Sequence, residues 1–245
     1  MNNYYGNNNR WAGSYNGPIM TTRSANAFLQ RVFFVMAAGL AITGLTAYGA
    51  ASYLFSNPEL LSTLFGSPLR WVIMLAPLAF VLILSFGINR LSYGAATLVY
   101  ALYAIVMGIS LSSIFFVYTA ASITSTFFIA AGTFGAMAFI GATTKMDLTK
   151  IGSVLIMALI GLVIASIVNW FMASSTLQYI ISYAGVVIFA GLTAYDTQRL
   201  LNLGAQMDMD NESAGKAAIM GALSLYLDFI NLFLFLLQVL GSKRE

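Results

Sequence analysis

Long stretches of this chain contain no charged residue. Four such intervals of 27, 19, 54 and 45 residues occupy positions 32–58, 71–89, 91–144 and 151–195. Because a helix crosses the hydrocarbon core of a bilayer in about 20 residues, the first two intervals each hold one membrane span. The last two are each long enough for two spans. A further apolar stretch at 217–240, whose one charged residue is Asp228, brings the predicted number of membrane-spanning helices to seven.

The composition excludes a soluble fold of this size. Hydrophobic residues make up 60% of the 245 residues, charged residues only 8%, and the mean hydropathy is +0.84. An ordinary soluble domain is about 25% charged, so this chain lacks the charges for a water-exposed surface. Its apolar stretches are continuous rather than alternating, which argues against a transmembrane β-barrel. We predict an all-α, polytopic membrane protein whose partner is the lipid bilayer. The basic pI does not indicate nucleic-acid binding, because with so few charges the basic excess is expected to set the membrane topology.

Turn-forming segments divide the long intervals. Residues 118–122 separate a third span at about 93–117 from a fourth at about 123–144. Residues 173–178 separate a fifth span at about 151–172 from a sixth at about 178–198. The first 27 residues are rich in Asn, Tyr and Gly and lack an apolar face. We expect a disordered polar tail at 1–27 and a seven-helix transmembrane domain at 28–245.

The distribution of basic residues predicts the orientation. With the N-terminus in the cytoplasm, eight basic residues lie inside and three outside: Arg10, Arg23, Arg31, Arg90, Lys145, Lys150, Arg199 and Lys216 against Arg70, Lys243 and Arg244. Because basic residues favour the cytoplasmic side, we expect a cytoplasmic N-terminus. The basic C-terminus does not fit, and a re-entrant last helix would bring it inside. The 24 residues at 217–240 exceed what one span needs, so we expect this helix to cross fully.

The chain has neither cysteine nor histidine. Disulfides, thiol nucleophiles, Ser-His-Asp catalysis and imidazole metal sites are therefore excluded. A centre that titrates near neutral pH has to be built from carboxylates. Two of these, Asp196 and Asp228, lie within or against the predicted spans, where inserting a charged side chain costs about 2.5–3.5 kcal/mol.

Asp228 lies 12 residues after Lys216, which places it about 18 Å along a helix and near the middle of the membrane. Steps of three and four residues along its face give a mostly small or polar stripe: Gly221, Ser224, Asp228, Asn231, Phe235 and Gln238. The other faces are apolar. We therefore expect the last helix to lie centrally, with this stripe inside the bundle. The alternative is that Asp228 only links helices through hydrogen bonds.

Asp196 lies near the cytoplasmic end of the sixth span. One interpretation is an ordinary helix pair with Arg199 at the interface. The other is that Asp196 meets Asp228, since the last two helices are consecutive and antiparallel. Arg90 ends the second span on the same side, either as a topological anchor or as a counter-charge for the two acids. The third helix also carries polar residues that are candidates to line an ion path: Tyr93, Thr97 and Tyr100.

Two segments resemble the signature sequences of a known family. GALSLYLDFINLFLFLLQVLG at 221–241 and GLTAYDTQRL at 191–200 closely resemble those of the Bax inhibitor-1 family, the transmembrane Bax inhibitor motif proteins. Residues 30–240 are similar to the bacterial branch that includes YccA-like inner-membrane proteins. The resemblance implies six helices around a central seventh and a pH-sensitive calcium leak gated by Asp196 and Asp228. It also implies an arginine partner, matched by Arg90, whereas an acid that some members carry in the second helix is absent here.

We weigh three functions. A pH-sensitive calcium leak channel is favoured, because calcium prefers oxygen ligands and four side chains can offer them transiently: Asp196, Asp228, Ser224 and Asn231. Two nearby carboxylates that share a proton would make a pH switch without histidine. The alternative is a non-conducting regulator of another membrane protein, such as an ATP-dependent membrane protease. An intramembrane aspartyl protease is disfavoured because its GxGD string is absent, so we expect no enzyme, no cofactor and a bacterial inner-membrane location.

Overall fold

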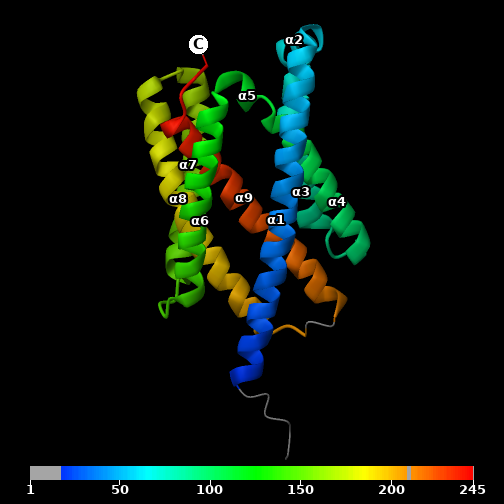
Figure 1. The fold of residues 1–245 in the computed structure, drawn as a ribbon. Helices are drawn as coiled ribbons and strands as arrows, with labels where there is room; N and C mark the ends of the chain where they lie inside the picture. Colours follow the sequence, from blue (N-terminus) through cyan, green and yellow to red (C-terminus); the bar gives the residue numbers. More distant parts are fainter. Residues whose placement is uncertain (1–17, 209–210, 245) are drawn as a thin grey trace, which may run out of the picture.

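The computed structural model describes residues 18–208 and 211–244. In this part of the chain, nine α-helices follow one another: α1 (Pro18–Ser56), α2 (Pro58–Gly66), α3 (Leu69–Gly87), α4 (Tyr93–Leu111), α5 (Ile114–Val117), α6 (Ala120–Thr143), α7 (Thr149–Met172), α8 (Ser175–Gly204) and α9 (Glu212–Leu240). Figure 1 shows a bundle with α2, α5 and the C-terminus at one end and the start of α1 at the other. We call the end where α1 begins the N side and the end where α9 finishes the C side.

Seven segments of the described chain are long and apolar enough to cross a membrane. They correspond to α1, α3, α4 with α5, α6, α7, α8 and α9, and they confirm the seven spans predicted from the charge-free intervals. The third span is interrupted at Ser112 and Ser113, where α4 ends and α5 adds a single turn. The chain is therefore an all-α, polytopic membrane protein.

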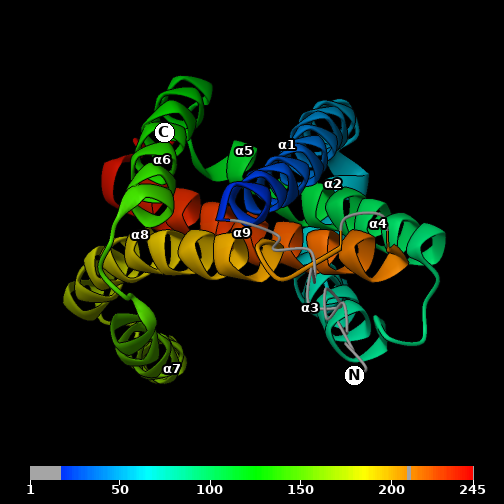
Figure 2. The same cartoon turned by 90° about the horizontal axis from the view of Figure 1, so that it is seen from below.

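The last helix is the most buried of the spans. α9 packs against α1, α3, α4, α6 and α8, whereas α3 and α7 are the least buried spans. Figure 2 shows α9 crossing the middle of the bundle with α8 alongside it. The ring of six helices implied by the resemblance is not confirmed, because α7 packs against α8 and faces α9 across a cavity.

Close approaches at two glycines fix how α8 and α9 pack. Leu200 on α8 fills the space that Gly221 leaves on α9, and Phe235 on α9 lies over Gly185 on α8. A Cβ atom on either glycine would collide with the facing side chain. These contacts set two antiparallel helices in a register that places Asp196 opposite Ser224.

The first helix begins earlier than the sequence indicates. Residues 1–17 of the predicted tail lie outside the described residues, but residues 18–27, also assigned to it, belong to α1. Ala25 is buried, and so is Phe28, which packs against Gly204 on α8. This contact is between distant segments, so the local composition does not reveal it.

The C-terminal residues are fixed against the turn between α5 and α6. The Thr119 N–H donates to the Ser242 carbonyl at 3.1 Å, and the Arg244 N–H donates to the Val117 carbonyl at 2.9 Å. The Arg244 guanidinium lies 5.0 Å from the centroid of the Phe55 ring on α1. α9 therefore runs from the N side to the C side, and the basic C-terminus forms part of the fold there.

Candidate functional site

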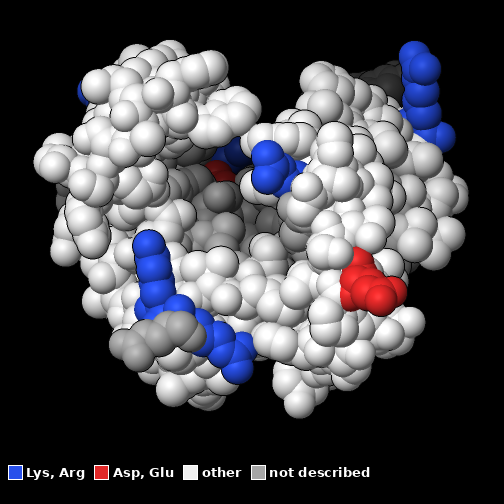
Figure 3. Space-filling model, turned by 90° about the horizontal axis from the view of Figure 1, so that it is seen from above, with Lys and Arg blue, Asp and Glu red and all other residues white. Residues whose placement is uncertain are grey.

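The two carboxylates singled out by the sequence line one cavity. Asp196 on α8 is 8% exposed, and Asp228 on α9 is 5% exposed. The cavity lies between α7, α8 and α9, has a volume of about 430 Å³ and is lined by Ile156, Leu159, Val163, Phe189, Leu192, Tyr195, Asp196, Arg199, Ser224, Leu227, Asp228 and Asn231. Viewed from the C side, the molecule is hollowed between two lobes, with acidic and basic atoms visible at depth (Figure 3). We refer to the cavity between α7, α8 and α9 as the aspartate cavity.

Asp196 is held by two partners. The Ser224 hydroxyl donates to Asp196 Oδ2 at 2.7 Å, across the interface of α8 and α9. On the same helix, Arg199 Nη1 lies 3.9 Å from Asp196 Oδ1, the i,i+3 pair that the sequence allows. The Arg199 side chain is 66% exposed and that of Asp196 only 12%, so this cation reaches out of the cavity. Such a loose and exposed pair screens the carboxylate weakly.

Asp228 has an unmatched oxygen. Its Oδ2 is buried and accepts no hydrogen bond from any described residue. Asp228 follows Ser224 by one helical turn, about 6 Å, toward the C side. In the described part of the chain, no hydrogen bond joins the two carboxyl groups. Asp196 contacts Ser224 and Arg199, whereas Asp228 Oδ2 stays unpaired. A buried polar atom without a partner is rare in a native fold and calls for an explanation, such as a functional role.

Two further residues of the predicted stripe, Ser224 and Asn231, also line the aspartate cavity. Asn231 Nδ2 donates to the Leu227 carbonyl of its own helix at 2.8 Å. The stripe thus places Ser224, Asp228 and Asn231 on one surface, as helical periodicity predicts. The opposite wall comes from α7 and is apolar, formed by Ile156, Leu159 and Val163. Sequence reasoning missed that wall, because its residues are ordinary for a membrane span.

An amide cluster joins the three helices beyond the cavity on the C side. Asn169 on α7 donates to Gln178 on α8 at 3.0 Å, and Gln178 Nε2 donates to Gln238 Oε1 on α9 at 2.7 Å. Ser182 also donates to Gln238 Oε1 at 2.8 Å. These bonds hold the C-side ends of α7, α8 and α9 together, so the cavity is bounded by fixed helices.

Arg90 is not in contact with either carboxylate. It follows the end of α3 on the N side and is exposed, and it forms no ion pair within residues 18–208 and 211–244. The cation near Asp196 in this structure is Arg199. The turn after α3 turns the Arg90 side chain to solvent, and the proposed pairing with Asp196 stays a prediction.

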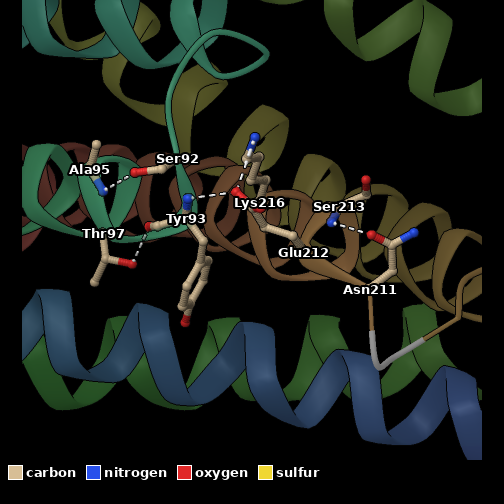
Figure 4. A network of polar contacts seen from close by, with 8 residues as sticks. All are labelled: Ser92, Tyr93, Ala95, Thr97, Asn211, Glu212, Ser213 and Lys216. Atoms are coloured by element: carbon tan, nitrogen blue, oxygen red, sulfur yellow. Dashed lines mark hydrogen bonds and ion pairs between the residues drawn. The ribbon is translucent and has the colours of Figure 1, made fainter.

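Tyr93 and Thr97 lie away from the aspartate cavity. The Tyr93 N–H donates to Glu212 Oε1 at 2.9 Å, and Glu212 also lies 3.4 Å from Lys216 Nζ (Figure 4). Thr97 donates to the Tyr93 carbonyl at 2.9 Å, and the Arg31 guanidinium lies 5.2 Å from the centroid of the Tyr93 ring. This network joins the N-side ends of α1, α4 and α9. Neither residue lines the cavity, because α4 packs on the other face of α9.

Tyr100, the third ion-path candidate, does not line the cavity either and belongs to a polar cluster on that other face, whose other members sequence reasoning missed. Tyr226 on α9 packs against Tyr103 and Tyr100 on α4, with ring centroids 5.1 and 6.3 Å apart. Thr43 on α1 donates to the Ala104 carbonyl at 2.9 Å, and its hydroxyl lies 2.7 Å from the Tyr226 hydroxyl. The available signal was Tyr226, which lies two residues before Asp228 and so about 200° around the helix.

The described residues contain no group of three His, Cys, Asp or Glu side chains that could hold a metal ion. The aspartate cavity offers two carboxylates, one hydroxyl and one amide. Calcium usually takes six to eight oxygen ligands. These four side chains are the candidates to contact such a cation in the described part of the chain.

Known proteins resemble this chain over most of its length. The family model of the inhibitor of apoptosis-promoting Bax1 matches residues 25–245. The inner membrane protein YbhL of Escherichia coli (strain K12) is 47% identical over 219 residues, covering 89% of this chain and 92% of YbhL. An uncharacterized protein of Borreliella burgdorferi is 44% identical over 221 residues, covering 90% and 94%. The uncharacterized protein YrjE of Lactococcus lactis is 36% identical over 229 residues, covering 92% and 96%.

Proposed function

The chain belongs to the Bax inhibitor-1 family, and on that premise we propose a non-enzymatic, pH-sensitive calcium leak channel of a bacterial inner membrane, gated by Asp196 and Asp228. One observation carries the proposal: α8 and α9 each bring a buried carboxylate to the same cavity. Oxygen atoms from Ser224 and Asn231 lie beside these carboxylates and suit a hard divalent cation.

The pH response rests on the two carboxylates. In a cavity of low dielectric, two nearby ionised acids repel each other, so gain or loss of one proton changes the charge that a passing cation meets. We assign the observed arrangement, with Asp196 on Ser224 and Arg199, to one state of the switch. In the other state Arg90, which lies on the same side of the membrane, takes the place of Arg199. The guanidinium group of Arg90 suits this exchange, because its N–H donors can hold a carboxylate through two hydrogen bonds.

The orientation follows from the basic residues on the two sides. In the described chain, the N side carries most of them, and Arg70, Lys243 and Arg244 lie on the C side. We propose that the N side faces the cytoplasm, since basic residues favour that side. Reporter fusions after Lys150 and after Glu245 test this, with the first cytoplasmic and the second outside.

Calcium flux across a defined bilayer tests the function. The purified full-length chain is reconstituted in liposomes with a trapped calcium dye, and the rate is measured across neutral pH. We expect wild-type flux to change with pH and Asp228→Asn to remove that dependence, because one remaining acid cannot share a proton. Arg90→Gln changes the pH profile without loss of folding, and Arg90→Lys keeps part of it. Glu59→Gln, which removes an exposed carboxylate on α2, is the matched control.

Two outcomes would contradict the proposal. Absence of flux from correctly folded protein favours the alternative, a non-conducting regulator of another membrane protein such as an ATP-dependent membrane protease. If Arg90→Gln leaves the pH profile unchanged while Asp228→Asn alters it, Arg90 is a topological anchor only.

A further inference from the structure

Much of the wall of the aspartate cavity is apolar, although a path for calcium alone requires only polar atoms. Its volume of about 430 Å³ is within the range of small-molecule sites, about 300–1,000 Å³. Oxygen atoms gather on one wall, formed by α8 and α9. The facing wall of α7 and the adjoining surface are hydrocarbon: Ile156, Leu159, Val163, Phe189, Leu192 and Leu227. A bare or hydrated metal ion would meet polar atoms on one side only.

The polar wall has a vacancy for a hydrogen-bond donor at Asp228. Asp196, by contrast, accepts a hydrogen bond from the Ser224 hydroxyl and lies 3.9 Å from the Arg199 guanidinium. Asp228 lines the same cavity, and its buried Oδ2 accepts no hydrogen bond from the described residues. Leaving a buried acceptor unpaired is unfavourable, and more so for a charged group. A ligand that brings N–H donors and a positive charge to this carboxylate removes that penalty.

The α7 wall of the cavity is also poorly covered by other helices. α3 and α7 are the least buried spans, and the α7 wall residues Ile156 and Val163 are about half exposed. On the C side, α3 and α7 approach each other through Trp71 and Trp170, whose ring centroids are 5.2 Å apart. Viewed from that side, the molecule is hollowed between two lobes (Figure 3). The half-exposed α7 side chains Ile156 and Val163 are available to contact an apolar molecule.

We propose that the aspartate cavity binds an amphiphilic primary ammonium ion, with the ammonium group on Asp228 and the hydrocarbon chain against α7. The inference uses the same cavity as the proposed function but does not depend on calcium flux. A primary ammonium has three N–H donors, whereas a quaternary ammonium has the charge without a donor. An alcohol of equal chain length has a donor without the charge. The site therefore ranks a primary ammonium above both.

Binding to the purified full-length protein in neutral detergent micelles tests this inference. The probes are hexylammonium, hexyltrimethylammonium and hexanol, each titrated by calorimetry and by the rise in unfolding temperature that a native-state ligand produces. We expect hexylammonium to bind wild type about tenfold or more tightly than either of the other probes. Asp228→Asn lowers hexylammonium affinity by about tenfold or more, and Glu59→Gln leaves it unchanged.

A second variant tests the apolar wall. Leu159→Trp fills the cavity from α7, a partly buried position, and is expected to weaken hexylammonium binding while the protein stays folded. Equal affinity of wild type and Asp228→Asn, or of hexylammonium and hexanol, would overturn the inference and indicate partition into the micelle. If hexylammonium binds but calcium flux is absent, the ligand site is supported and the channel proposal is contradicted. If calcium flux is present but hexylammonium does not bind, the channel proposal stands and the ligand site is contradicted.

Discussion

The two faces of α9 differ in how closely the neighbouring helices pack around a buried polar side chain. On the face toward α1 and α4, Tyr226 is fully buried among aromatic rings and its hydroxyl lies 2.7 Å from that of Thr43. On the face toward α7, Asp228 is almost as buried but borders a cavity of about 430 Å³. Both residues are polar and two positions apart. What differs is whether the facing helix fills the space.

This difference separates stability from function along one helix. Close-packed aromatic rings gain dispersion contacts over their whole surface, so the tyrosine face holds the bundle together. A cavity forfeits those contacts, and a carboxylate beside it adds an insertion cost. The aspartate face therefore weakens the fold. Selection for stability alone would favour filling it, so its presence fits a site that has to admit a ligand or ion.

The largest effect is expected from deleting the tyrosine at the centre of the packed face. Tyr226→Ala lowers the free energy of unfolding by about 3–5 kcal/mol, since it leaves a large cavity in the core. Asp228→Asn changes that free energy by less than about 1 kcal/mol, because the amide occupies the same open space. Thermal unfolding of the purified variants in detergent measures both. Equal losses at the two positions would show that the faces do not differ.

A smaller loss is expected where α1 approaches the tyrosine cluster. A Cβ atom on Gly39 would collide with the Tyr100 hydroxyl, so Gly39→Ala should cost about 1–3 kcal/mol through overpacking. Gly44→Ala on the same helix is the matched control, because nothing lies within 4 Å of its added methyl group. That variant is expected to be neutral or slightly stabilising. A stable Gly39→Ala protein would mean that the cluster is loosely packed.

Removing single hydroxyl groups distinguishes paired from unpaired tyrosines. Tyr226→Phe breaks the contact with Thr43 and should destabilise the protein by about 1 kcal/mol. Tyr100→Phe should be neutral or stabilising, because the Tyr100 hydroxyl is buried and has no partner in the described residues. Unfolding free energies of the two variants are compared directly. A loss at Tyr100 equal to that at Tyr226 would indicate that a water molecule pairs with the Tyr100 hydroxyl.

The smallest effect concerns an acid in water, which serves as a reference for the two buried acids. Hydrogen bonds from the side chain and the backbone N–H of Thr149 hold the pKa of Asp147 below its ordinary value of 3.8. A lowered pKa in the folded state means that the stabilisation is present above the unfolded value and is lost as the pH falls through the folded one. The difference in unfolding temperature between wild type and Asp147→Asn should therefore be present near neutral pH and vanish in acid. A difference that persists in acid would assign the effect to the loop conformation.

Much of the fold can be predicted from the sequence, because each membrane span requires a long apolar segment with few charges. Charge-free intervals predict the spans, and helical stepping from Asp228 finds Ser224 and Asn231 on its face. The rotation of each helix about its axis and its choice of neighbours are tertiary properties. The sequence therefore predicts an ion-path position for Tyr93, although α4 lies across α9 from the cavity. It predicts Arg199 only as the i,i+3 partner of Asp196, and the α7 wall has no distinguishing sequence feature.

The buried position of α9 has a consequence for the order in which the protein is made. The ribosome synthesises α9 last, so Thr43 and Asp196 enter the membrane before Tyr226 and Ser224 exist to pair with them. Until α9 is inserted, the six earlier spans form an incomplete bundle whose polar groups have no partners. Each unpaired polar group in lipid destabilises this bundle. Asp228, the residue with the highest insertion cost, arrives only after α7 and α8 have built the cavity that accommodates it. Nascent chains that stop before Glu212 cannot close the bundle, so the native state is completed only after α9 has been made.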